Sequence, residues 1–258
     1  MKFNLNLNSK QYSESELIVL GAYHHKNDDI AQFGSSWAKD LKSTFLAMNC
    51  SRSFKGKLGE QVVFNTPCGQ QFLALGLGNK SKLTHEVLRK ELSKLNASWN
   101  KKVKSLTLQI DGLKTKGGLE ETLSTTIEAF ELSSYKFDRH LSESKKPRLE
   151  TIILDSTEKS SKKSRLQKEI DKTLLLTQSI NVARDFVNEP PNVLNSETYA
   201  KFVKKDVSKI KGVKAKVLGK KELEKEKAGL FLSVNAGSAY EPQLVHLTYT
   251  PKKGTSKT

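Results

Sequence analysis

The stretch ARDFVNEPPNVL, from Ala183 to Leu194, decides how this chain is organised. Upstream of its two prolines, apolar residues recur at a spacing of 4, 3 and 4 positions, at Leu176, Ile180, Ala183 and Val187. This spacing predicts a helix with one apolar face that runs into the motif. Pro190 and Pro191 then end the helix, because proline donates no backbone hydrogen bond and disfavours the helical conformation of the residue before it.

A second helix is expected directly after the prolines. Asn195 or Ser196 offers a side chain that caps a helix, and Glu197 places a negative charge in the first turn, where the helix dipole favours it. Apolar residues then follow at helical spacing, at Tyr199, Val203, Val207 and Ile210. The motif is therefore predicted to be a rigid corner between two helices.

Several runs of sequence, taken in order, carry a family resemblance. They are FKGKLGE (54–60), LALGLGNKSKLTHEVLRK (73–90), ARDFVNEPPNVLNSE (183–197), GVKAKVL (212–218) and KELEKEKAGLFLSVNAGSAYEPQLVHLTY (221–249). The first two resemble the N-terminal domain of the leucyl (cytosol) aminopeptidase family of two-metal peptidases. The last three resemble the entry into the catalytic domain of that family, and the ordered series is more specific than any one motif.

The resemblance implies an α/β fold with a macro-like N-terminal domain, a linker helix and an incomplete second α/β domain. The expected boundaries are 1–155 for the N-terminal domain, 156–188 for the linker and helix, and 189–258 for a truncated start of the catalytic domain. The resemblance also implies that the full-length enzyme removes N-terminal residues from peptides with two divalent ions, zinc or manganese. By the same resemblance it would form a hexamer.

No residue of this chain receives a chemical role from the resemblance. In the family, the metal ligands lie downstream of the strand that matches Leu244 to Tyr249, in a glycine-lysine-glycine segment continuing to Phe-Asp-Ser-Gly-Gly and in an Asn-Thr-Asp-Ala-Glu-Gly-Arg segment. Neither segment occurs in this sequence. A two-metal hydrolase needs several carboxylates around cations about 3.5–4 Å apart. We therefore assign no catalytic, cofactor-binding or metal-ligating residue, and expect the chain alone to be inactive. The expected partners are the missing catalytic half or further copies of the chain in a homo-oligomer.

The composition favours a globular protein of one or two domains, with 258 residues of which 36% are hydrophobic. No apolar run approaches the roughly 20 residues that a membrane helix needs, and residues 1–16 lack the basic and apolar regions of a signal peptide. A cytoplasmic protein without a membrane partner is therefore expected. Cys50 and Cys68 form no CxxC pair, which predicts buried or half-buried free thiols and disfavours a disulfide or a zinc site.

The net charge of +16, from 44 basic and 28 acidic side chains, leaves an alternative open. The positive electrostatic field of a chain with this charge attracts polyanions. A basic nucleic-acid-binding module on the same scaffold is therefore the second hypothesis. Of the basic residues 38 are lysine and six are arginine, and lysine is a poor bidentate reader of bases. Any nucleic-acid binding is therefore expected to be weak and non-specific, and the charge to serve mainly solvation.

Strands and helices are predicted to alternate over residues 1–155, which indicates an α/β layer. Strands are expected at Leu17–Gly21, Ser105–Ile110 and Thr151–Asp155, a hairpin at Gln61–Phe64 and Gln71–Leu75, and helices at Thr84–Ser98, at Gly118–Leu132 and around Trp37, Leu41 and Phe45. Gly76 and Gly78 lie where a phosphate-binding turn would lie. The third glycine of that motif is absent, so a plain tight turn is favoured and no nucleotide is assigned.

The second half of the chain is predicted to contain a linker and an incomplete domain. The segment 156–172 is charged and low in apolar residues, which indicates a linker merging into the helix before the prolines. Strands are expected at Val213–Val217, Leu230–Val234 and Leu244–Thr250, and a short helix at Lys220–Lys227 that Gly229 ends.

Other candidate ligands are weak. His24 and His25 would point to opposite faces of a strand, and lone histidines such as His85, His140 and His246 are more often surface or hydrogen-bonded core residues than ligands. Asp28-Asp29 is predicted to be a turn. The basic residues Lys162, Lys163 and Arg165 fit a localisation-like or anion-binding cluster, but a solvated linker is favoured.

Overall fold

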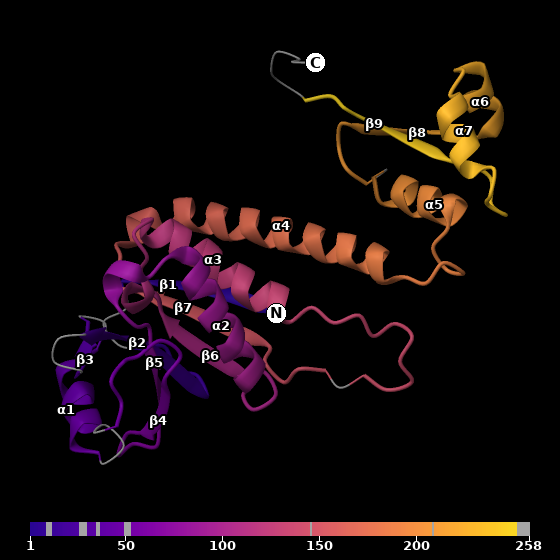
Figure 1. Ribbon diagram of the computed structural model, residues 1–258. Coiled ribbons are helices and arrows are strands. Elements are labelled where there is room, and N and C mark those ends of the chain that lie inside the picture. The colour runs from indigo at the N-terminus through magenta and orange to yellow at the C-terminus, as the bar shows by residue number, and fades with distance from the viewer. Residues whose placement is uncertain are drawn as a thin grey trace. The chain divides into compact units, whose positions relative to one another are not determined.

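A computed structural model describes residues 1–8, 12–25, 30–34, 37–48, 53–144, 146–207 and 209–251 (Figure 1). The chain divides into two compact units, Met1–Val182 and Ala183–Thr258. Among the residues that the structure covers, none of the helices combines the length and the apolar character of a membrane span.

The first unit is built on a mostly parallel sheet. Its strands are β1 (Lys2–Leu7), β2 (Leu17–His25), β3 (Ile30–Phe33), β4 (Gln61–Asn65), β5 (Gln71–Gly76), β6 (Ser105–Gln109) and β7 (Thr151–Ser156). The strand order is β1-β7-β6-β2-β5-β4, with β3 paired to β2 off this path. The pairs β1·β7, β7·β6, β6·β2 and β2·β5 are parallel, whereas β4 and β3 run antiparallel to their partners.

Helices cover both faces of this sheet, so its central strands are apolar on both sides. The helices are α1 (Lys39–Ala47), α2 (His85–Trp99), α3 (Gly118–Ser133) and α4 (Lys163–Asn188), with short 3₁₀ turns η2 (Lys80–Lys82), η3 (Ile110–Leu113) and η4 (Ser160–Lys162). Leu17 and Val19 of β2 join the core that holds buried residues of α2, α3 and α4. Ile18 and Leu20 point the opposite way, into an aromatic core with Phe45 of α1.

The predicted α/β class is confirmed, and the predicted strands and helices of this unit are present, although Trp37 lies just before α1 and not within it. The hairpin β4–β5 joins residues 61–65 to 71–76, and helix α2 begins after Thr84, whose hydroxyl accepts a hydrogen bond from the amide of Val87 (3.2 Å). The strands β1 and β3 were not predicted. The expected linker is already helical from Lys163 onward, because Leu166 and Ile170 are buried in the core of this unit.

The second unit holds α5 (Ser196–Val207), β8 (Val213–Leu218), α6 (Lys220–Lys225), α7 (Gly229–Asn235) and β9 (Leu244–Tyr249). Strands β8 and β9 form an antiparallel pair, with Val213 opposite Tyr249 and Leu218 opposite Leu244. In β8, half-buried Val213, Ala215 and Val217 alternate with exposed lysines, as predicted.

The strand predicted at Leu230–Val234 is wrong, because these residues lie in helix α7. A short apolar run fits a strand or a helix equally well, and periodicity alone does not separate them. Gly229 was also misplaced as a helix end, since it begins α7. The left-handed residue after α6 is Lys227 (φ 54°), and the amide of Ala228 donates back to the carbonyl of Leu223 (3.0 Å).

The prediction of buried thiols is wrong for Cys68, which is exposed in the loop between β4 and β5. Cys50 lies outside the described residues, and so does the turn predicted at Asp28-Asp29.

Candidate functional site

The corner predicted at the double proline is present in the second unit. Helix α4 ends at Asn188, and the carbonyl of Pro190 accepts a hydrogen bond from the amide of Val193 (2.9 Å), which closes a tight turn. Phe186 and Tyr199, on either side of the turn, pack edge to face with ring centroids 5.3 Å apart. The corner is therefore held by a turn hydrogen bond and by an aromatic pair.

Helix α5 starts with a reciprocal cap. The side-chain oxygen of Asn195 accepts from the amide of Thr198 (3.1 Å), and the Thr198 hydroxyl accepts from the amide of Asn195 (2.9 Å). Ser196, the other predicted cap, instead donates its hydroxyl proton to the carbonyl of Glu241 (2.6 Å). The first turn of α5 is thereby tied to the segment that leads into β9.

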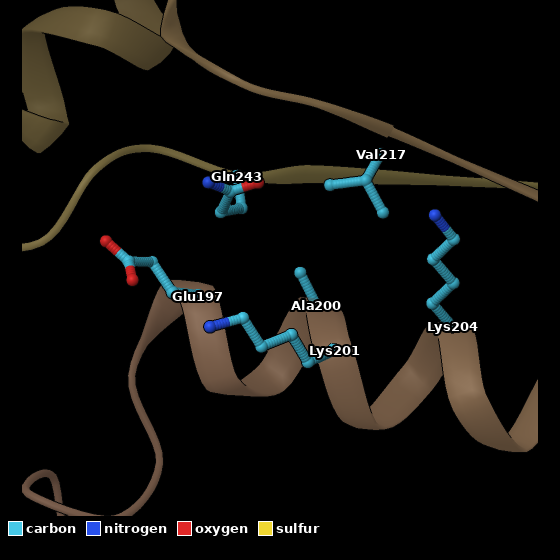
Figure 2. A pocket seen from close by; sticks show the side chains of 6 residues that line it. All are labelled: Glu197, Ala200, Lys201, Lys204, Val217 and Gln243. Atoms are coloured by element: carbon cyan, nitrogen blue, oxygen red, sulfur yellow. The ribbon is translucent and has the colours of Figure 1, made fainter.

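A pocket of about 230 Å³ lies between α5 and the antiparallel pair of strands β8 and β9 (Figure 2). It is lined by Glu197, Ala200, Lys201 and Lys204 from α5, by Val217 from β8 and by Gln243 next to β9. Figure 2 shows Ala200 and Val217 pointing toward each other, with charged side chains on both sides of them. An apolar centre with polar groups around it is the usual construction of a small-ligand site.

The charges of this pocket are not neutralised by close pairs. Among the described residues, no ion pair within 4.0 Å joins Glu197, Lys201 or Lys204 to an opposite charge. The pocket is smaller than the roughly 300 Å³ at which typical ligand sites begin. It offers a carboxylate, two ammonium groups and an amide, but neither a hydroxyl or thiol nucleophile nor a histidine base lines it. As it stands, the pocket supports binding and provides no catalytic group set.

No ligand set for a metal is present in the part of the chain that the structure describes, where no three His, Cys, Asp or Glu side chains are gathered. His24 and His25 both lie on strand β2, which is the condition for their side chains to point to opposite faces, and His246 lies on β9. His85 faces Glu121 at 3.3 Å, and His140 packs against Phe137. The described residues therefore do not fit a divalent metal centre, and no chemical step through a metal is assigned to them.

The Gly76-Leu77-Gly78 turn is structural. Its amides already donate to backbone carbonyls: Gly76 to Glu60 (2.8 Å), Leu77 to Ala22 (2.8 Å) and Gly78 to Gly56 (2.9 Å). Since a phosphate-binding turn needs amides that are free to face the anion, this turn has none to offer.

The basic cluster at the start of α4 is also largely neutralised. The Lys162 ammonium lies 3.1 Å from a carboxylate oxygen of Glu158, and the Arg165 guanidinium contacts Glu120 at 2.6 Å. Lys163 begins α4. These pairs disfavour a dedicated anion site at this position.

Sequence reasoning predicted helix α5 but missed the pocket on it. Glu197, Ala200, Lys201 and Lys204 are spaced by three and four positions, so they share one face of α5, and this spacing was visible in the sequence. The contributions of Val217 and Gln243 were not visible, because only the pairing of β8 with β9 brings them onto that face.

Two family models match the chain, in order along the sequence. The model described as the cytosol aminopeptidase family, N-terminal domain, matches residues 19–144, and the model described as the catalytic domain of the same family matches residues 181–258. The chain belongs to the cytosol aminopeptidase family. The resemblance found in the sequence is thus confirmed.

Relatives of this family match most of the chain. A probable cytosol aminopeptidase of Clostridium perfringens is 34% identical over 218 residues, which are 82% of this chain and 43% of the relative. Another from Wolbachia pipientis wMel is 30% identical over 96% of this chain and 47% of the relative. The chain spans about half the length of the curated relatives it matches.

Solved structures with the same fold include a mutant tomato leucine aminopeptidase, with a TM-score of 0.80, 21% identity, and coverage of 100% of this chain and 53% of that one. The bottromycin maturation enzyme BotP in complex with Mn has a TM-score of 0.68 and 19% identity, with coverage of 93% and 46%. The matching family models and the curated relatives give no support to the nucleic-acid-binding alternative.

Proposed function

We propose that this chain forms the N-terminal domain and the opening of the catalytic domain of a leucyl aminopeptidase, a hydrolase that releases N-terminal amino acids from peptides. The observation that carries the proposal is the ordered match of both family models, to residues 19–144 and 181–258. In this proposal, residues 1–155 are the N-terminal domain, 156–188 the linker with its helix, and 189–258 the start of the catalytic domain.

The metal chemistry of the proposed enzyme comes from residues outside these 258. Two divalent ions, zinc or manganese, would polarise the peptide carbonyl and activate water there. Two observations support this division: the two ligand-bearing segments of the family do not occur in the sequence, and the described residues gather no metal ligands. The chain's own role is to fix the corner and to build the first elements of the catalytic domain.

The proposed enzyme is a cytoplasmic homohexamer. The name shared by the curated relatives, cytosol aminopeptidase, supports the location. Strongly exposed apolar side chains support an assembly that covers the second unit: Val187, Leu230 and Val234 are each at least 85% exposed. Single exposed apolar residues are ordinary, but three of this size within one small unit favour a further partner surface.

The test compares the chain alone with a chimera in which the unmatched remainder of the Clostridium perfringens relative follows residue 258. Each protein is incubated with manganese or zinc and a chromogenic leucine amide. We expect no hydrolysis and no stoichiometric metal binding by the chain alone, and hydrolysis by the chimera that a chelator abolishes.

The control is the same remainder produced without residues 1–258. Chelator-sensitive hydrolysis by the chain alone would refute the proposed division of labour. A folded, metal-loaded chimera without activity on any N-terminal residue of a peptide panel would refute the aminopeptidase assignment itself.

A further inference from the structure

A basic cavity of about 390 Å³ opens on the first unit beside the end of β2. Its lining combines Tyr23 of β2, Gln32 and Phe33 of β3, Lys42 of α1 and Lys80 of η2. Its volume falls within the range of roughly 300–1,000 Å³ that small-molecule sites occupy. None of these residues takes part in the corner or in the pocket of the second unit.

Two aromatic rings hold the two lysines of this cavity. The Lys42 ammonium lies 5.6 Å from the centre of the Phe33 ring, and the Lys80 ammonium lies 5.4 Å from the centre of the Tyr23 ring. At these distances the negative face of a ring attracts the cation. The rings are themselves fixed, since the Tyr23 hydroxyl donates to the carbonyl of Gly112 (3.0 Å) and Phe33 packs edge to face on Trp37 (4.6 Å between centroids).

The backbone also positions the Lys80 side of the cavity. Gly78 adopts a left-handed conformation (φ 67°), and the carbonyl of Gly78 accepts from the amide of His24 (2.8 Å), next to Tyr23. The side-chain oxygen of Asn79 then accepts from the amide of Ser81 (2.9 Å), which starts the η2 turn that carries Lys80. The turn at Gly76–Gly78 thus has no free amide that could bind an anion, but it places Lys80 in the wall of the cavity.

The charge of the cavity is not compensated within the described part of the chain. Neither Lys42 nor Lys80 has a carboxylate within 4.0 Å there, and the described residues of the lining include no acidic side chain. Lys94 and Lys114, by contrast, each have an acidic partner within 2.8 Å. Asp40, the acidic residue nearest Lys42 on α1, lines a different cavity. Two ammonium groups without a nearby carboxylate make the electrostatic potential in the cavity positive, which favours the binding of an anion.

We propose that this cavity binds a phosphate group, with Lys42 and Lys80 as its cationic ligands. A dianion matches two ammonium groups, and lysine acts as a point charge toward phosphate. The exposed Gln32 side chain adds an amide that donates hydrogen bonds, and the space over the two rings accommodates the organic part of a phosphate monoester. This binding function is independent of the peptidase reaction.

The test titrates the full 258-residue chain with inorganic phosphate and, separately, with phenyl phosphate, by calorimetry at constant ionic strength. We expect saturable binding with one site per chain. The double variant Lys42→Gln/Lys80→Gln should bind at least tenfold more weakly. The control Lys39→Gln/Lys82→Gln removes two exposed lysines from α1 and η2 that lie outside the cavity, so it should change the affinity by less than twofold.

Saturable binding of both ligands, lost only in the Lys42/Lys80 variant, supports a phosphate monoester as the occupant; binding of inorganic phosphate alone, with the same loss, supports the free ion. Equal weakening in both double variants would show that the net charge attracts phosphate without a site, and would overturn the proposal. Absence of saturable binding by the unmodified chain would do the same. Circular dichroism of each variant establishes that it is folded.

Discussion

At the scale of single residues, Asp111 has a clear electrostatic effect on the fold. Burial raises the pKa of this carboxyl, but hydrogen bonds from Lys114 (2.8 Å) and from the amide of Thr157 (2.6 Å) outweigh burial and lower the pKa. A lowered folded-state pKa gives stability that is present above the unfolded-state value of about 3.9 and is lost as the pH falls through the folded value. We expect Asp111→Asn to cost about 1–2 kcal/mol in urea unfolding at pH 7, and clearly less at pH 3.

Glu131 provides a control, because its pKa is shifted in the opposite direction to that of Asp111. Burial raises its pKa, and the nearby N-terminal ammonium offsets this only in part. A raised carboxyl pKa gives stability below the unfolded-state value that is lost as the pH rises through the folded value. Glu131→Gln should therefore stabilise the protein more at pH 7 than at pH 3. A pH-independent effect at both positions would contradict the assignment of these two pKa shifts.

At the scale of elements, the end of β5 and the FKGKLGE loop are locked together by close backbone contact. The amide of Gly59 donates to the carbonyl of Gly76 (2.9 Å), and a Cβ on Gly76 would lie 2.0 Å from the carbonyl oxygen of Lys57. A rigid backbone atom does not yield as a side chain does. We expect Gly76→Ala to destabilise the first unit by more than about 3 kcal/mol, measured by urea unfolding with the tryptophan signal.

The control variant is Gly69→Ala, which tests backbone strain without a close contact. Gly69 is left-handed (φ 83°), but a Cβ there meets nothing within 4 Å. Gly69→Ala should therefore cost only the conformational penalty of about 1–2 kcal/mol. Similar losses in the two variants would show that the two segments are not in tight contact.

At the scale of the whole molecule, the two units differ in how much apolar surface they bury. Of the buried hydrophobic side chains in the described residues, only Ala200 and Leu223 belong to the second unit. Local opening is easiest where buried apolar contacts are few. We expect amides of β5 and β6 to exchange with deuterium at least about 100-fold more slowly than amides of α7 and β9.

Mass spectrometry with proteolysis after exchange resolves these segments on one sample, and size-exclusion chromatography records the oligomeric state. Addition of a separately produced remainder of a family relative should slow exchange in β9 and leave β5 unchanged if the proposed assembly is right. Equal protection of both units in a monomer would contradict the expected difference in stability.

The sequence by itself determined the family, the α/β class and those helices, caps and strands that are specified by residues close together in the chain. The helix before Pro190, the cap at Asn195 and the hairpin between β4 and β5 depend on residues only a few positions apart, so spacing and capping chemistry predicted them. The alternation of Phe3, Leu5 and Leu7 with polar residues is also a local signal, and it indicates the strand β1.

Tertiary structure alone decided the features that depend on distant residues. β1 is placed by its parallel pairing with β7, some 150 positions away, and α7 is helical although its apolar run also fits a strand. The basic cavity brings Lys42 together with Lys80 because the antiparallel strand β3 and the glycine turn after β5 meet at the end of β2. Local propensity does not predict such tertiary contacts, because the free energy that stabilises them comes from packing and pairing between segments far apart in the chain.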